Sequence, residues 1–254
     1  MEGDIVYQVM EHVGYITISR VHKMNAITKA MAEKLQEVAD KVNKDANVRV
    51  VVLSGDGEKS FSTGSDIKLL HQYGNPWELR NRQDYCKAIR SIRKPVIAKI
   101  KGYALGGGFE LVLASDIRVA VEEAKFAASE VKHGWISGSG LIQILARNIG
   151  YNKAAKLVLT GAMVDAVEGQ RLGFINDVVS LVNIDAFVED MAKAMTALSP
   201  MALQLAKQDL INSQNTPLDM GLQYENDLFA FSFTTEDSRE GLQAFQEKRQ
   251  PNFK

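Results

Sequence analysis

The stretch that decides the fold reads Pro95-Val-Ile-Ala-Lys-Ile-Lys-Gly-Tyr-Ala-Leu-Gly-Gly-Gly-Phe-Glu-Leu-Val-Leu-Ala-Ser-Asp-Ile-Arg-Val-Ala-Val121. Its apolar, β-branched run at 96–100 predicts a buried strand, and residues 116–121 predict a second one. Between them, three consecutive glycines open a helix at about 108–114. A strand, a glycine turn, a helix and a strand in this order indicate an α/β fold with parallel strands.

The same alternation of strands and helices precedes this stretch. Residues 5–19 predict a β-hairpin, and residues 48–53 predict another buried strand. The segment between them predicts an amphipathic helix that ends near Asn43, with Asn25 and Thr28 as candidate caps. A strand, a helix and a strand again form a parallel crossover unit.

Helices dominate the remaining segments. Residues 77–93 predict one polar helix, and after Gly150 only 178–182 predicts a short strand. Further helices are expected at about 153–159, 165–172, 184–198 and 200–211. The helical region 222–233 is rich in Phe and Tyr, which is typical of a buried core or of a subunit contact.

The composition narrows the classes of function. The 254 residues carry 30 Lys and Arg against 31 Asp and Glu, a net charge of -1, so nucleic acid is not an expected partner. The single cysteine, Cys86, has no partner for a disulfide or a thiolate metal cluster, which is typical of a reducing compartment. The acidic N-terminus is unlike a secretory signal, and no apolar run reaches the ~18 residues that span a bilayer. We therefore expect a cytoplasmic protein that does not bind membranes.

The glycine triplet Gly106-Gly107-Gly108 is the first candidate site. Without Cβ atoms the backbone can approach a ligand closely, and the N–H groups and dipole of the following helix favour negative charge there. The alternative, a tight turn without a function, is equally compatible with the glycines. The spacing matches neither a phosphate loop nor a dinucleotide-binding fingerprint.

A second candidate site is the segment Phe61-Ser-Thr-Gly-Ser-Asp-Ile-Lys68, which follows the strand at 48–53. Ligands of open α/β sheets bind beyond the C-terminal ends of the strands, where both segments are expected. Two such loops can each give one N–H group to a single oxygen and so form an oxyanion hole. The alternative is an ordinary turn in which Asp66 caps a helix.

Two carboxylates accompany these loops. Glu110 follows the glycine triplet in an otherwise small and apolar segment, where an unpaired buried charge is strongly unfavourable. Glu130 follows 20 residues later, beyond the strand at 116–121, and a chain return of this length can bring both to one pocket. The alternative is that both are ordinary solvated surface groups.

Taken together, these segments resemble the crotonase (enoyl-CoA hydratase/isomerase) family over nearly the full length of the chain. The similarity begins with Arg20-Val-His-Lys-Met-Asn-Ala26 and continues through 61–68 and 102–111. It extends to Leu-Thr-Gly at 159–161, to Ala166, Gly169 and Gly173, and to the terminal run at 236–253.

The resemblance implies a spiral of ββα turns closed by C-terminal helices. Residues 1–190 would form the catalytic core, and residues 191–254 a helical oligomerisation region that makes a homotrimer or a dimer of trimers. The substrate would be an acyl-CoA thioester, without a metal or a separate cofactor. The implied activity is that of an enoyl-CoA hydratase-like lyase.

The resemblance also implies the roles of individual residues. Ser65 and Gly107 would provide the oxyanion-hole N–H groups, and Glu110 and Glu130 are the counterparts of the two catalytic glutamates of hydratases. Lys248 would reach the nucleotide of a neighbouring subunit. The full set of implied substrate and CoA contacts is Lys23, Asn25, Thr63, Ser65, Asp66, Ile67, Lys68, Gly106, Trp135 and Lys248.

The chemistry of hydration explains why two carboxyls are needed. Adding water to a 2-enoyl thioester requires one group that deprotonates water and another that protonates C2, while negative charge develops on the thioester oxygen. Crowding two carboxyls keeps one protonated near neutral pH. We interpret Glu110 as the group that orients and deprotonates water and Glu130 as the proton carrier for C2, although coupled groups can share these roles.

The sequence departs from the family pattern after Glu130. It reads Gly134-Trp-Ile-Ser-Gly-Ser-Gly140, with Ser137 in place of a proline. Trp135 would restrict the acyl chain or stack on a flat acyl group, or else pack at a helix start. His133 is a third acid–base candidate, with a surface role as its alternative. Val21 and Ser129 also stand where the family often has proline.

These departures leave alternatives to simple hydration. On the same scaffold they are a carnitinyl-CoA dehydratase, an enoyl-CoA isomerase and a ring-opening acyl-CoA hydrolase. Outside catalysis the alternative is an acyl-CoA- or RNA-binding paralogue. The two retained glutamates argue against a loss of chemistry, and the balanced charge argues against RNA.

Overall fold

Two β-sheets form the centre of the molecule in the computed structural model, which describes residues 3–253. The larger sheet has the order β1-β2-β3-β5-β7-β10 and the smaller one β4-β6-β8-β9. The strands of the larger sheet are β1 (Asp4–Met10), β2 (Val13–Ser19), β3 (Val50–Gly55), β5 (Val96–Ile100), β7 (Ile117–Val121) and β10 (Asp177–Val179). Those of the smaller sheet are β4 (Ser60–Ser62), β6 (Tyr103–Leu105), β8 (Lys125–Ala127) and β9 (Met163–Asp165). The expected N-terminal segment and the expected domain boundaries include Met1, Glu2 and Lys254. These three residues lie outside the described part of the chain.

The two sheets are built by one repeated path of the chain. β3 and β4, β5 and β6, and β7 and β8 each place the first strand of a pair in the larger sheet and the second in the smaller one. The larger sheet is parallel apart from the β1–β2 hairpin, and β4, β6 and β8 are parallel to one another. The predicted hairpin and the predicted spiral of ββα turns are therefore confirmed.

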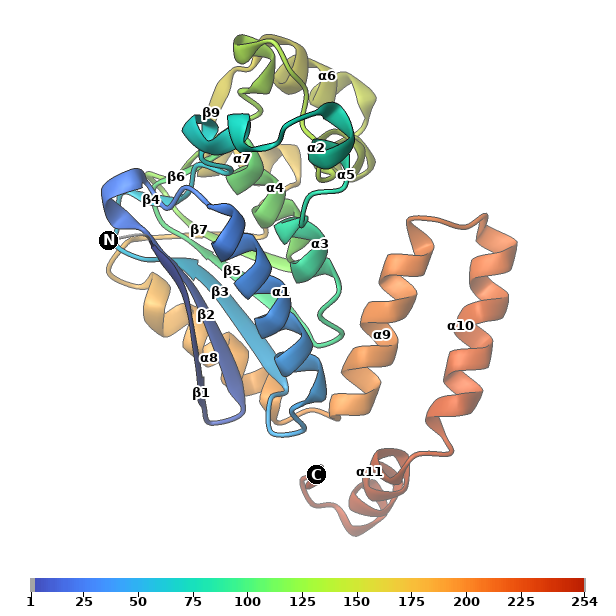
Figure 1. The fold of residues 1–254 in the computed structure, drawn as a ribbon. Coiled ribbons are helices and arrows are strands. Elements are labelled where there is room, and N and C mark those ends of the chain that lie inside the picture. The colour runs from blue at the N-terminus through green and yellow to red at the C-terminus, as the bar shows by residue number, and fades with distance from the viewer. Residues whose placement is uncertain (1–2, 254) are drawn as a thin grey trace.

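Helices cover both faces of the larger sheet. α1 lies on one face and α8 on the other, where α8 packs on β2, β3, β5 and β7 (Figure 1). The helices are α1 (Lys29–Lys44), α2 (Pro76–Arg80), α3 (Tyr85–Arg90), α4 (Gly107–Ala114), α5 (Leu141–Ile149), α6 (Tyr151–Thr160), α7 (Ala166–Leu172), α8 (Ile184–Thr196), α9 (Pro200–Ser213), α10 (Leu218–Ser232) and α11 (Glu236–Glu247). Short 3-10 helices are η1 (Val21–Lys23), η2 (Ile67–Gln72) and η3 (Glu130–His133). No helix among the described residues, 3–253, is long and apolar enough to cross a membrane.

The single helix predicted for 77–93 is wrong, because the structure divides it into α2 and α3. The carboxylate of Asp84 accepts hydrogen bonds from the N–H groups of Cys86 (2.9 Å) and Lys87 (3.0 Å), so a new helix begins after it. An Asp side chain that bonds backbone N–H groups in this way competes with the continuation of a helix.

The sequence offers Asn25 and Thr28 as N-caps for the helix after the hairpin. In the structure Thr28 is the N-cap. Its hydroxyl accepts a hydrogen bond from the N–H of Met31 at 3.2 Å. Asn25 has a φ of 56°, and its buried side chain bonds other segments instead. The three-residue strands of the smaller sheet were not expected, since so short a segment shows no periodicity.

Candidate active site

Two loops meet backbone to backbone at the N-terminus of α4. A Cβ atom on Gly64, whose φ is 80°, would lie 2.6 Å from the nitrogen of Gly107. A Cβ atom on Gly108 would lie 1.9 Å from the carbonyl oxygen of Ser62. Because a real Cβ atom cannot approach so closely, only glycine allows this contact. The glycine triplet therefore brings the loop at 61–68 against the start of α4.

The N–H groups of Ser65 and Gly107 are free at this meeting point. Among the hydrogen bonds of residues 3–253, none uses either group as donor. Tyr85, at the start of α3, connects the two residues: its hydroxyl lies 3.0 Å from Oγ of Ser65 and 1.9 Å from the position of a Cβ atom on Gly107. Tyr85 is buried, and nothing in its sequence neighbourhood indicated this position.

Glu110 lies in the first turn of α4 and is only 4% exposed. Its Oε1 accepts hydrogen bonds from the N–H groups of Ser139 (2.7 Å) and Leu141 (3.3 Å), at the N-terminus of α5. Burial raises the pKa of Glu110, the two N–H donors oppose this, and the charge of Glu130 raises the pKa further. The predicted placement of Glu110 away from solvent is therefore seen in the structure.

Glu130 lies at the start of η3 and is also buried. A Cβ atom on Gly106 would be 3.4 Å from its Oε1, so the side chain lies over the glycine that precedes α4. Its Oε2 is buried and has no hydrogen-bond partner among the described residues. Glu130 beside the cap residue Gly106 and Glu110 in the first turn of α4 therefore both lie at the N-terminal end of this helix. An unpartnered buried carboxyl oxygen is unfavourable without a ligand.

Two arginines hold the loop that carries the N–H donors of Glu110. Nη1 of Arg90 donates to the carbonyl of Ser139 at 2.6 Å, and Nη2 of Arg82 donates to its hydroxyl at 3.1 Å. Arg90 also lies 3.5 Å from a carboxyl oxygen of Asp84. Neither arginine was expected from sequence. The Gly-Ser-Gly segment before α5 could have indicated a partner for Glu110, because a helix N-terminus favours a nearby carboxylate.

The segment around Asn25 was expected to contact CoA. Asn25 is buried, and its side-chain amide donates to the carbonyls of Ser60 (2.7 Å) and Asp56 (2.9 Å). Its Oδ1 accepts from the N–H of Arg20 at 2.9 Å. All of these bonds are internal, so the amide of Asn25 holds the segment in place and leaves ligand contact to its neighbours.

The 63–68 segment is tied to the same region. The N–H of Thr63 donates to the carbonyl of Met24 at 3.2 Å. Asp66 accepts from Arg20 at 2.7 Å, an interaction that lowers the pKa of Asp66. Lys23, Ile67 and Lys68 are exposed, and neither lysine forms an ion pair with any described residue.

Two of the expected contacts lie outside this cluster. Lys248 ends α11, at the opposite end of the molecule from the N-terminus of α4 (Figure 1). Trp135 follows η3, is 40% exposed and stacks on His133 with ring centres 5.1 Å apart. The imidazole therefore covers one face of the indole.

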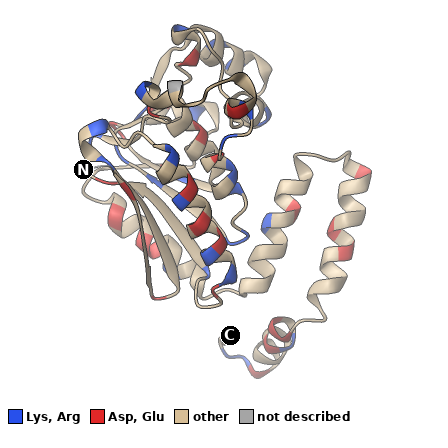
Figure 2. Cartoon of the chain, viewed as in Figure 1, with Lys and Arg blue, Asp and Glu red and all other residues tan. Residues whose placement is uncertain are grey.

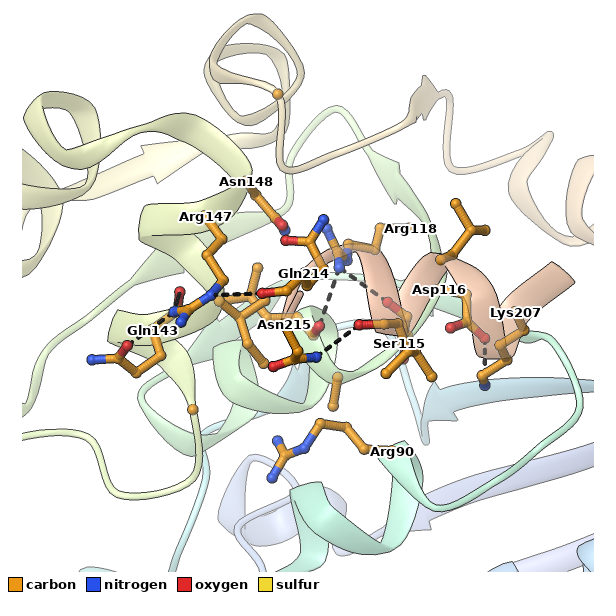
Figure 3. A pocket seen from close by; sticks show the side chains of 17 residues that line it. Arg90, Ser115, Asp116, Arg118, Gln143, Arg147, Asn148, Lys207, Gln214 and Asn215 are labelled. Carbon is orange, nitrogen blue, oxygen red and sulfur yellow. Dashed lines mark hydrogen bonds and ion pairs between the residues drawn. The ribbon is translucent and has the colours of Figure 1, made fainter. Parts of the chain in front are cut away.

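A cavity of about 910 Å³ lies elsewhere, between α4, α5 and α9. Figure 3 shows several of its labelled side chains joined by hydrogen bonds and ion pairs to other residues that line it. Lys207 forms an ion pair with Asp116 at 2.6 Å, and Arg118 donates to the carbonyls at the end of α4. Neither glutamate lines this cavity, so we assign the chemistry to the smaller site at the glycine loops.

Known proteins match this arrangement over nearly the whole chain. A family model described as enoyl-CoA hydratase/isomerase matches residues 8–254. The (E)-benzylidenesuccinyl-CoA hydratase of Thauera aromatica is 36% identical, over 98% of both chains. The crotonyl-CoA hydratase of Syntrophomonas wolfei is 33% identical, over 98% of this chain and 97% of the relative. A crystal structure of an enoyl-CoA hydratase from Bacillus anthracis has a TM-score of 0.90 at 36% identity, over 98% of both chains. The chain therefore belongs to the enoyl-CoA hydratase/isomerase (crotonase) family and is an enoyl-CoA hydratase-like lyase.

Proposed function

We propose that the protein catalyses the reversible addition of water to a 2-enoyl-CoA, which gives a 3-hydroxyacyl-CoA. The observation that carries this proposal is the pair of buried carboxyls, Glu110 and Glu130, beside two free N–H groups. Hydration needs both features, because a proton leaves water and another reaches C2 while charge develops on the thioester oxygen.

In the proposed reaction the N–H groups of Ser65 and Gly107 bind the thioester oxygen. As the enolate forms, each donor contributes about 3–4 kcal/mol, by analogy with measured oxyanion donors. The hydroxyl of Tyr85 keeps the two loops in register, since it touches both Ser65 and Gly107. The free state of both N–H groups supports this role.

The two glutamates divide the proton transfers. Glu110 is the base that orients and deprotonates water, because burial raises its pKa and makes it more basic while the N–H groups of Ser139 and Leu141 hold its Oε1 in place. Glu130 carries the proton to and from C2, and its unpartnered Oε2 is the atom available for this step.

The CoA part of the substrate is anionic, whereas the chain has a net charge of only -1. Binding therefore relies on local groups. We propose that Lys23 and Lys68, which are exposed and without ion pairs in the described chain, face the phosphates. Thr63, Ser65, Asp66, Ile67 and Gly106 supply the nearby backbone, which Asn25 holds in place.

Residues 191–254 form the proposed assembly region of a homotrimer or of a dimer of trimers. α10 packs on α9, and together they form an arm with few charged residues (Figure 2). Phe229, Phe231 and Phe233 are 62%, 52% and 51% exposed, so they do not belong to the core of this chain. Covering them with a second copy would remove this apolar surface from water. Lys248 would then reach a neighbouring nucleotide.

Trp135 is proposed to lie near the acyl end of the substrate. It follows Glu130 closely in sequence, and the backbone N–H of Trp135 donates to the backbone carbonyl of Glu130 at 3.3 Å. Its indole is held by His133 on one face and is still 40% exposed. A flat acyl group could stack there.

The roles of the glutamates are tested by hydration of crotonyl-CoA, followed by the loss of absorbance of the conjugated thioester. Glu110→Gln and Glu130→Gln should each lower kcat by about 10²–10⁴-fold, because each removes one acid–base group. Glu123→Gln, in the exposed turn before β8, is the matched control and should behave as wild type. If both site variants stayed within about tenfold of wild type, a loss below ~1.4 kcal/mol, the assignment would be wrong. Mass spectrometry of the products would confirm the gain of one water.

A further inference from the structure

A second, smaller cavity lies beside the proposed oxyanion hole. Ser65 and Tyr85 line it, and so does Arg82 from the segment between α2 and α3. Its other walls come from the start of α1, from η2 and from the segments beside them, and they combine apolar side chains (Ile27, Ala32, Leu69 and Leu70) with polar ones. The cavity measures about 30 Å³, so it can take a group the size of a carboxylate next to a guanidinium, while the rest of an acyl chain would lie outside it.

Arg82 is a cation without a carboxylate partner in the described chain. Its Nη1 donates to the carbonyl of Leu79 at 3.0 Å and its Nη2 to the hydroxyl of Ser139 at 3.1 Å, and both acceptors are neutral. The neighbouring arginines differ: Arg20 pairs with Asp66 at 2.7 Å and Arg90 lies 3.5 Å from Asp84. A guanidinium has five N–H donors, so several remain for a ligand.

Among the described residues, Asp66 is the only carboxylate that lines the same cavity, and Arg20 already neutralises it. Lys29 is a second cation on the cavity wall. Glu110 is reached from Arg82 only through Ser139, whose N–H binds Glu110 while its hydroxyl binds Arg82. The cavity thus has an excess of positive charge, and a partly buried cation of this kind is stabilised by an anionic ligand.

We propose that Arg82 binds a carboxylate on the acyl group, so that the preferred substrates are CoA thioesters of dicarboxylic acids. This inference rests on the proposed hydratase function and deepens it. The planar guanidinium matches a carboxylate with two parallel hydrogen bonds, which gives the site both charge and directional selectivity. A neutral acyl chain of equal length would leave Arg82 without a counter-ion.

The test compares the binding of glutaryl-CoA and pentanoyl-CoA by calorimetry. The two thioesters have the same number of acyl carbons and differ by a terminal carboxylate in place of a methyl group, so the contribution of CoA cancels. Wild type should bind glutaryl-CoA about tenfold to hundredfold more tightly. Arg82→Gln should abolish this preference by weakening glutaryl-CoA binding alone.

Arg90→Gln is the matched control, because Arg90 holds the same residue, Ser139, but does not line the cavity. It should keep the preference for glutaryl-CoA even if catalysis suffers. The proposal is overturned if wild type binds both thioesters equally, or if Arg82→Gln retains the preference. It is overturned as well if Arg82→Gln weakens both thioesters alike, which would place Arg82 on the CoA moiety, or if Arg90→Gln also loses the preference.

The binding test is independent of hydration, because neither saturated thioester can add water. An Arg82-dependent preference together with no hydration of any enoyl-CoA would refute the hydratase and leave the recognition intact. Hydration of crotonyl-CoA without any preference for glutaryl-CoA would refute the recognition of a carboxylate by Arg82 and leave the hydratase function intact.

Discussion

Glu110 is a buried carboxyl whose environment favours the protonated form more than water does. Burial raises its pKa, and the N–H groups of Ser139 and Leu141 only partly offset this. The folded chain therefore holds this proton more tightly than the unfolded chain, and the resulting stabilisation is complete below the ordinary value of 4.5. It is lost as pH rises through the raised pKa, because the ionised group then remains buried.

This linkage predicts a pH-dependent effect of Glu110→Gln on stability. Because glutamine is neutral at every pH, the variant should unfold at a higher temperature than wild type at about pH 8, and the gap should shrink towards about pH 4. Thermal unfolding followed by circular dichroism measures the unfolding temperature of wild type and variant at each pH. Glu123→Gln, which is exposed, should show no such trend. If Glu110→Gln changed the unfolding temperature by the same amount at both pH values, the prediction would be contradicted.

At the scale of elements, the site depends on the contact between the 61–68 loop and α4. The backbone of Gly108 approaches Ser62 so closely that a Cβ atom would lie 1.9 Å from its carbonyl oxygen. This contact sets the spacing between the N–H groups of Ser65 and Gly107. Any side chain at Gly108 must therefore separate the two loops.

Gly108→Ala is expected to lower the free energy of unfolding by about 1–3 kcal/mol, because the added methyl group meets rigid backbone. Gly221→Ala, near the N-terminus of α10, is the control: the nearest neighbour of the added Cβ atom would be Oγ1 of Thr216 at 3.5 Å. It should raise the free energy of unfolding by about 0.5–1 kcal/mol through helix propensity alone. Urea titrations compare the two, and equal effects would contradict the close contact.

At the scale of the whole molecule, α9 and α10 pack on each other and form an arm that stands beside the sheets (Figure 1). Several of its apolar side chains are exposed, Phe229 and Phe231 among them. An arm of this kind is stable when another subunit covers it. We therefore expect assembly through residues 191–254.

Phe231→Asp should dissociate the assembly, because it places a charge in the apolar face of the arm. Light scattering after size-exclusion chromatography should give a trimer or a multiple of it for wild type and a smaller species for the variant. Val182→Asp changes an apolar residue that is 89% exposed and lies outside the arm, and it should leave the assembly intact. A monomeric wild type would contradict the prediction.

The sequence by itself determined the elements whose pattern is local. The apolar runs that became β3, β5 and β7 repeat over several residues, and the glycine triplet marks the start of α4. Glu110 could be singled out because burying a charged side chain in so apolar a segment is unfavourable unless the charge has a partner. The family resemblance then predicted the ββα spiral that the two sheets display.

Only the tertiary structure decided the surroundings of the site. The break between α2 and α3 depends on the carboxylate of Asp84, and the three-residue strands of the smaller sheet exist only through their partners. Tyr85, Arg82 and Arg90 look like ordinary residues of a polar helix in sequence, because a role that consists of contacts across the chain leaves no periodic trace. It was the packing of α3 against α4 and the loop before α5 that brought them to Ser65, Gly107 and Ser139.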